Sequence, residues 1–113
     1  MSRRARSEVH WDDMAEIPYR SSRVMKTLGN PKTYALASLL LQEEVLNVGE
    51  MCAALRRSYV AVSKMLRSLR ELDIVRYQKE QGFTVYTLKD PAALRDLLHS
   101  GERLAERAGK KAS

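Results

Sequence analysis

The sequence predicts a mainly α-helical fold with one small β-hairpin, and three observations lead to this fold class. Apolar residues recur at helical spacing in four segments before residue 73 and in one segment after residue 90. Between these segments, β-branched and aromatic residues gather on both sides of Gln81-Gly82. A chain of 113 residues that is 44% hydrophobic also suits a single globular domain. The predicted order of elements is α-α-α-α-β-β-α.

The first two helices are expected on either side of residues 29 and 30. A short apolar pattern from Tyr19 ends at Gly29, which is a typical helix C-cap. Asn30-Pro31 then supplies an N-cap and a first-turn proline for a helix that runs to about Gln42. Because this second helix is apolar on most sides, we expect it to be the central buried helix.

The next two helices form a helix-turn-helix pattern. Asn47 and Glu50 fit a capping box at the start of a short helix. Ser58 can cap the following helix, which is predicted to run to about Leu72. The apolar residues of each helix fall on one face, as in a tightly connected amphipathic pair. They are Val48, Met51, Cys52 and Leu55 in the first helix and Val62, Leu66 and Leu69 in the second.

The rest of the chain predicts a hairpin with a glycine turn at Gln81-Gly82 and a closing helix that Asp90-Pro91 begins. Helices, a helix-turn-helix, a hairpin and a closing helix in this order make a winged helix-turn-helix domain. We expect this domain to span residues 19–108, because Pro18 interrupts any earlier helix. Residues 1–18 are expected to be a flexible basic arm and residues 109–113 a basic tail.

Positive charge is concentrated in one segment of the chain. The net charge is +6, and residues 56–80 hold seven basic and three acidic residues, a net +4. A local positive patch on a small domain is typical of a protein that binds a polyanion. The alternative on charge alone is a solvated face that serves solubility.

The helix after Ser58 carries the candidate DNA-binding face. If its leucines point inward, helical spacing places Tyr59, Val60, Ser63, Lys64 and Arg67 outward. Side chains of these types contact base edges in the major groove, so we expect base contacts near the start of the helix and a phosphate contact at Arg67. The rest of the predicted DNA-binding set is Arg56, Arg57 and Ser58 beside the helix start, and Arg76 and Lys79 on the wing.

Three stretches of the sequence resemble the ArsR-type winged-helix repressors. They are Leu28-Gly-Asn-Pro31, Leu46-Asn-Val-Gly-Glu-Met51 and Val62-Ser-Lys-Met-Leu-Arg-Ser-Leu-Arg-Glu-Leu-Asp-Ile-Val75. The resemblance covers residues 19–108 and is most specific from Ser58 to Val75. It implies a homodimer joined through its first and last helices, operator binding that blocks transcription, and often release by a metal or redox signal.

The metal sites of this family are not matched here. A Cys-Val-Cys box of the family falls on Asn47-Val48-Gly49, which contains no cysteine. A second pattern, Asp-x-His-x10-His-x-x-Glu, falls on residues that include no histidine, namely Asp90, Ala92, Arg103 and Glu106. A tetrahedral zinc site needs thiolates or neutral imidazoles, so we expect no metal and no cofactor.

Four other residues carry no assigned function. Cys52 is the only cysteine, and its place on the apolar side of a helix predicts that it packs as a small hydrophobic residue. His10 and His99 are isolated imidazoles with no third ligand in view, and Trp11 in the arm could contact DNA, a partner subunit or neither.

The closing helix predicts a homodimer. Its leucine stripe is too long for one small core, and Gly101 permits the close approach of a second helix. A twofold dimer would present two reading helices about 34 Å apart to a pseudo-palindromic operator. The alternative is a closing helix that packs entirely on its own domain. The expected interface residues are Val24, Leu28, Leu94, Leu97, Leu98, Gly101 and Leu104.

Together these observations favour a sequence-specific, double-stranded DNA-binding transcriptional regulator that acts as a homodimeric repressor. The alternative is a winged helix that binds proteins within a transcription-related complex. An enzyme is not expected, because the sequence has no glycine-rich phosphate loop and no nucleophile with a base at a recognisable spacing. No apolar stretch approaches the roughly 18 residues of a membrane span, and no secretory signal is evident, so we expect a cytoplasmic protein without a membrane partner.

Overall fold

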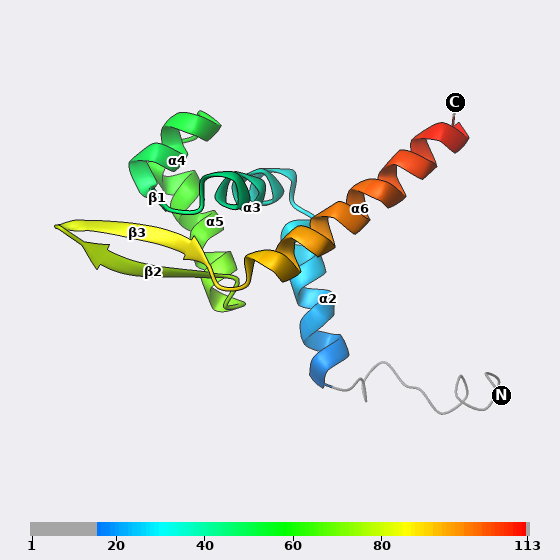
Figure 1. Ribbon diagram of the computed structural model, residues 1–113, viewed down its shortest axis with the longest axis horizontal. Coiled ribbons are helices and arrows are strands. Elements are labelled where there is room, and N and C mark those ends of the chain that lie inside the picture. Colours follow the sequence, from blue (N-terminus) through cyan, green and yellow to red (C-terminus); the bar gives the residue numbers. More distant parts are fainter. Residues whose placement is uncertain (1–15, 113) are drawn as a thin grey trace.

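The structure, a computed structural model, describes residues 16–112 of the chain, with side chains described for residues 16–107. Its elements follow the predicted order, with one short strand added (Figure 1). They are α2 (Glu16–Leu28), α3 (Pro31–Glu43), β1 (Leu46–Asn47), α4 (Val48–Leu55), α5 (Tyr59–Glu71), β2 (Val75–Glu80), β3 (Phe83–Leu88) and α6 (Pro91–Ala112). The predicted winged helix-turn-helix fold is therefore confirmed.

Local side-chain caps explain where four of the helices begin. The Asn30 side chain accepts hydrogen bonds from the first backbone N–H groups of α3. Asn47 and Glu50 form the predicted capping box at the start of α4, with N···O distances of 2.8 and 2.9 Å. Ser58 caps α5 and Asp90 caps α6 through similar bonds of 3.1 and 3.0 Å. Each cap had been predicted from a spacing of three residues or fewer.

The first and last helices are longer than the sequence pattern predicts. Helix α2 begins at Glu16, so Pro18 lies in its first turn, where a missing N–H breaks no helical hydrogen bond. Helix α6 continues to Ala112, through most of the expected tail. The rest of the expected arm, including His10 and Trp11, lies outside the described residues.

The hairpin turns at Gln81 and Gly82, which adopt φ angles of 49° and 87°. Positive φ angles at both central residues are typical of a two-residue hairpin turn. Glycine at the second position adopts such an angle with little conformational strain. Strand β1 pairs antiparallel with β3, so the sheet has three strands in the order β1-β3-β2. The predicted hairpin is confirmed, and β1 adds a third strand of two residues to it, which is too short to leave a clear pattern in the sequence.

The core is centred on α3, as predicted. Leu36, Ala37 and Leu40 of this helix are fully buried. They lie within one cluster that receives apolar side chains from every other helix and from the start of β2. Leu69 of α5 and Met51 of α4 are also fully buried, which fixes the helix-turn-helix pair on the same core.

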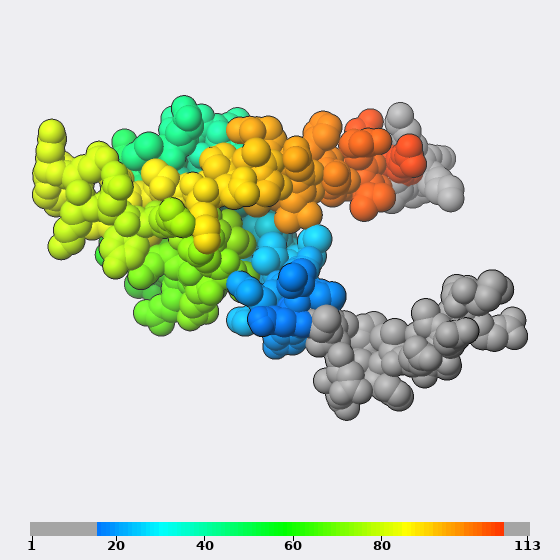
Figure 2. All heavy atoms as spheres, turned by 60° about the horizontal axis from the view of Figure 1, so that its bottom comes forward, coloured from blue at the N-terminus to red at the C-terminus, as the bar shows by residue number. Residues whose placement is uncertain are grey.

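Helix α6 extends well beyond this core (Figures 1 and 2). Leu94 and Leu98 in its first turns are each 6% exposed, whereas Leu104 is 71% exposed. The second half of α6 therefore presents an apolar residue to solvent on an extended helix.

Candidate nucleic-acid interface

A tight turn of three residues joins α4 to α5. Arg56 ends α4 in the left-handed conformation, with φ 53° and ψ 49°, and its N–H donates to the Cys52 carbonyl. Arg57 also donates to that carbonyl, at 3.2 Å, and Ser58 then caps α5. The chain thus reverses quickly between two short helices, which is the predicted helix-turn-helix.

Helix α5 separates its side chains into a buried and an exposed face. Val62, Leu66 and Leu69 are at most 2% exposed and point into the core, as predicted. Tyr59 and Val60 are each 67% exposed. Lys64 and Arg67 are exposed as well, and Ser63 is half-buried at the edge of the face. We call the surface made by these five outward residues the outer face of α5.

The other residues of the predicted DNA-binding set are also exposed. Arg56, Arg57 and Ser58 surround the start of α5, and Arg76 and Lys79 lie on β2. Successive side chains of a strand point to opposite faces, so Arg76 and Lys79 leave the wing on opposite sides. Lys79 shares its side with Tyr77. The structure therefore collects eight of these residues around α5 and separates the two wing cations.

One contact at this surface had not been predicted. The Arg70 guanidinium lies over the Tyr77 ring, 4.3 Å from its centroid, and joins the end of α5 to the wing. The Tyr77 ring in turn lies 5.9 Å from that of Tyr86 on β3. Helical spacing places Arg70 one turn after Arg67. Nothing in the neighbouring sequence predicts that the Arg70 side chain contacts Tyr77 on β2.

Two polar contacts join segments that are distant in the sequence, one at the base of the wing and the other between α3 and α6. The Lys89 ammonium donates to the Asp73 carboxylate, and this hydrogen bond lowers the pKa of Asp73. The Tyr34 hydroxyl donates to the Glu102 carboxylate at 2.9 Å and so joins α3 to the middle of α6. Burial, assisted by that carboxylate, raises the pKa of Tyr34.

The residues expected at a dimer interface divide into two groups. Leu28, Leu94 and Leu98 are 5–6% exposed, so they are largely taken up by the core of their own chain. The others keep more surface: Val24 and Leu97 are half-buried, and Gly101 and Leu104 are exposed. The helical spacing of apolar residues places both groups on one face of their helices. It does not show at which residue of α6 the contact with the core ends.

Within the described residues, no group of three or more His, Cys, Asp or Glu side chains could hold a metal ion. Cys52 is half-buried and packs against the core. His99 is exposed on α6. None of the helices in the part of the chain that the structure describes has the length and apolar character needed to cross a membrane.

Comparisons with known proteins were made for the sequence and for the fold. No protein-family model matches the sequence, and no curated protein matches it. Among solved structures, the transcriptional regulator HlyU from Vibrio vulnificus CMCP6 is 33% identical, with 79% of this chain and 94% of that chain covered and a TM-score of 0.63. HlyU from Vibrio cholerae N16961 is 29% identical, with 77% and 96% covered and a TM-score of 0.67.

A third structure is less similar in sequence and shows the fold alone. Mb0332 from Mycobacterium bovis, a possible ArsR-family transcriptional regulator, is 18% identical. Its homodimeric winged helix-turn-helix DNA-binding domain covers 88% of this chain and is itself 94% covered, with a TM-score of 0.72.

The order of elements, the tight α4–α5 turn and the exposed outer face of α5 define a winged helix-turn-helix transcriptional regulator. The 33% identity to the Vibrio vulnificus regulator extends over nearly all of that chain. This chain belongs to the ArsR-type winged-helix regulators, the family that its sequence motifs resemble.

Proposed function

We propose that this chain is a sequence-specific regulator that binds double-stranded DNA as a homodimer and represses transcription. The outer face of α5 is the observation that carries the proposal. Four of its five residues are exposed and Ser63 is half-buried, while the leucines of the same helix are buried in the core. A helix of this kind fits the major groove of B-DNA, which is about 12 Å wide.

Base recognition falls to the first two turns of α5 in this proposal. Lys64 donates to guanine or to a nearby phosphate, and Ser63 forms a hydrogen bond with a base edge. Tyr59 and Val60 offer apolar contact to thymine methyl groups. Arg67, one turn later, contacts the DNA backbone and fixes the position of the helix.

Cations around α5 supply the affinity that does not depend on sequence. Arg56 and Arg57 lie at the start of α5 beside the capping residue Ser58, and the helix dipole there also favours an anion. Arg76 and Lys79 extend this positive charge along the wing. We expect the affinity to fall steeply with salt, because each neutralised phosphate releases counterions.

The homodimer is supported by apolar residues that remain exposed on the first and last helices. Ile17 and Met25 of α2 are 78% and 51% exposed, and Leu104 of α6 is 71% exposed. The Mycobacterium bovis neighbour, which shares this fold, is homodimeric. Twofold pairing through α2 and α6 would place two α5 helices on one side of the DNA, about 34 Å apart.

Repression follows from occupancy, because a dimer that covers two successive grooves of a promoter excludes other proteins from it. The proposal includes no metal or cofactor. Where the family's metal boxes have cysteines and histidines, this chain carries Asn47, Gly49, Ala92 and Arg103, which are not zinc ligands. We expect the regulator to act in the cytoplasm.

Selection of bound duplexes from a random pool tests the dimer and the DNA target together. We expect a symmetrical site with two half-sites about one helical turn apart. When that site overlaps a promoter, added protein should lower transcript yield in a purified transcription reaction. An asymmetric single site would contradict the dimer, and unchanged transcript would contradict repression.

Three substitutions test the assignment of the outer face. K64A and S63A should relax base preference at defined positions, each by about 1–3 kcal/mol of discrimination. R76A should weaken binding to all sequences alike and make the salt dependence shallower by about one phosphate. Equal affinity of all three variants and the unaltered protein for the selected site would show that this surface does not bind DNA.

A protein-binding winged helix remains the second candidate, and one observation favours it. Tyr59 and Val60 on α5 and Phe83 at the wing are all more than 60% exposed, and exposed apolar side chains are common in protein interfaces. Titration with random duplex at low salt separates the two functions. No binding at micromolar protein would favour the protein-binding module.

A further inference from the structure

A hollow between α2, α3 and α5 carries positive charge outside the segment that contains the proposed DNA-binding face. Its volume is about 360 Å³, many times the roughly 30 Å³ that one water molecule occupies. Two cationic side chains and four polar residues line it, and none of the lining residues is acidic. They are Arg23, Lys26, Thr27, Asn30, Thr33 and Ser68.

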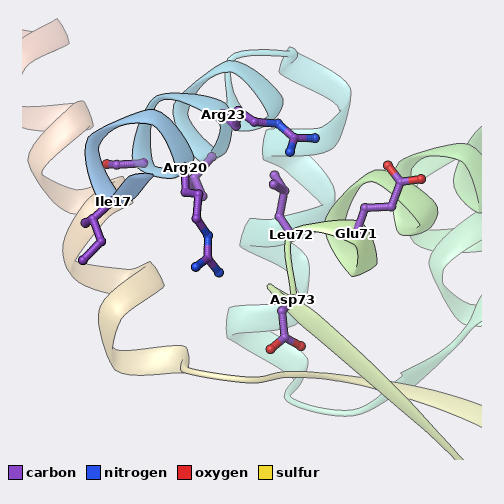
Figure 3. A pocket seen from close by; sticks show the side chains of 8 residues that line it. Ile17, Arg20, Arg23, Glu71, Leu72 and Asp73 are labelled. Atoms are coloured by element: carbon purple, nitrogen blue, oxygen red, sulfur yellow. The ribbon is translucent and has the colours of Figure 1, made fainter. Parts of the chain in front are cut away.

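The neighbouring hollow between α2 and the end of α5 differs in charge (Figure 3). Arg20 and Arg23 extend from α2 on one side of it, and Glu71 and Asp73 bring two carboxylates on the other. Because the opposite charges balance there, that hollow has no reason to prefer an anion. Arg23 borders both hollows. The hollow between α2, α3 and α5 has no acidic residue in its lining, whereas the neighbouring one has two.

The Thr33 side chain is the most buried polar group of the cationic hollow. Thr33 is only 5% exposed, and its hydroxyl has no hydrogen-bond partner in the part of the chain that the structure describes. The hydroxyl is nevertheless accessible from the hollow that it lines. Because this hydroxyl has no partner among the described residues and is accessible from the hollow, it is available to donate a hydrogen bond to a ligand there.

The start of α3 contributes no free backbone donor to this hollow. The N–H groups of Lys32 and Thr33 already donate to the Asn30 side chain, at 2.9 and 3.4 Å, and Pro31 has no N–H. The N–H of Tyr34 bonds the Asn30 carbonyl at 2.9 Å. Any anion in the hollow must therefore be held by side chains, namely the two cations and the Thr33 hydroxyl group.

The hollow lies beside the outer face of α5, on the flank away from the wing. Ser68 is adjacent to Arg67, and its hydroxyl donates to the Lys64 carbonyl at 3.3 Å. The wing occupies the opposite flank, where Arg70 stacks on Tyr77. Further cations continue on the hollow's side, because Lys32 and Arg57 line another hollow nearer the start of α5.

We propose that the cationic hollow binds a phosphate group of the DNA backbone, on the edge of the major groove opposite the wing. The inference rests on the proposed function, because it requires α5 to lie in the groove. Arg23 and Lys26 neutralise the phosphate, and the Thr33 hydroxyl donates a hydrogen bond to it. The reading helix is then held by backbone contacts on both of its flanks.

Duplex binding across about 50 to 200 mM salt tests this site with the full chain. The double variant R23A/K26A should lose roughly tenfold in affinity for every sequence, and its salt dependence should be shallower by about one phosphate. T33V keeps the shape of the side chain and should weaken binding by roughly threefold or more through loss of the hydroxyl alone. R95A is the matched control, since Arg95 is an exposed cation on α6 near the other end of α3.

Failure of this site is distinguishable from failure of the proposed function. If R23A/K26A binds as tightly as R95A while R67A binds more weakly, the hollow does not contact DNA, although the function stands. If the unaltered chain binds no duplex at low salt, the function itself is wrong. If inorganic phosphate shifts the Thr33 amide resonance at constant ionic strength while R23A/K26A keeps full DNA affinity, the site serves a small anion and the proposal is overturned.

Discussion

Helices α5 and α6 are both amphipathic, but they differ in how much of the apolar face the chain itself covers. In α5, Val62, Leu66 and Leu69 are all at most 2% exposed. In α6, Leu98 is 6% exposed and Leu104, less than two turns later, is 71% exposed. The same sequence pattern thus marks a completed core in one helix and an uncovered surface in the other. The comparison separates a helix whose apolar face the chain covers completely from one whose apolar face it covers only in part.

The largest expected effect is the loss of a buried leucine of α5. L69A should lower the free energy of unfolding by about 2–5 kcal/mol, because it opens a cavity in a fully packed core. L104A should change it by less than about 0.5 kcal/mol at low protein concentration, where the chain is monomeric. Urea unfolding of both variants measures the difference. Equal losses would show that α6 is as fully packed as α5.

Self-association should depend strongly on Leu104, although the stability of the single chain should not. L104D should weaken it by at least tenfold, because each buried leucine contributes about 1.5–3 kcal/mol and a twofold contact contains two copies. L104M keeps an apolar side chain and serves as the control. Sedimentation across a range of concentrations measures the effect. A dimer that is equally stable in L104D would place the contact elsewhere on the chain.

A smaller effect is expected where α3 is joined to α6. Y34F removes the hydrogen bond to Glu102 and should cost less than about 1 kcal/mol, because Glu102 is exposed to water. Hydrogen exchange in the middle of α6 should become faster, whereas exchange in α5 should stay the same. Faster exchange in both helices would indicate a general loss of stability instead of a local one.

The smallest effect concerns the ion pair between the end of α5 and the start of α6. The Lys89 hydrogen bond lowers the folded-state pKa of Asp73, so the pair stabilises the fold above the ordinary pKa of an aspartate, about 3.9. This contribution is lost as the pH falls through the lowered pKa. D73N removes the charge and keeps a residue that tolerates the φ of 58°.

Urea midpoints at pH 7 and pH 3 measure that contribution. The midpoint of the unaltered chain should fall slightly more between these pH values than that of D73N. The difference should be small, because both side chains are exposed and water screens the pair. Identical pH dependence of the two proteins would show that the pair contributes nothing to stability.

The sequence predicts the local features of this fold well, because each depends on residues close together in the chain. The caps at Asn30, Asn47 and Ser58 involve partners no more than three residues away. The inward and outward faces of α5 follow from helical periodicity in the same way. The sequence alone therefore predicts which side chains of α5 face outward.

The features that the sequence could not predict join distant segments. Arg70 meets Tyr77 across two elements, and Leu46 pairs with Tyr86 forty residues away. The cationic hollow joins residues 23 and 26 to residue 68, so a charge count along the chain assigns them to separate segments. Periodicity also could not locate the point on α6 where the core ends, because that point depends on how α2 and α3 pack.

Asn47 has two structural roles that bear on how the molecule would adapt to its target. It pairs with Val85 in the sheet, and its side chain caps α4. A hinge between the wing and the helix pair would have to rupture both interactions at once. We therefore expect the wing and the helix pair to keep a constant spacing and to move together as one unit.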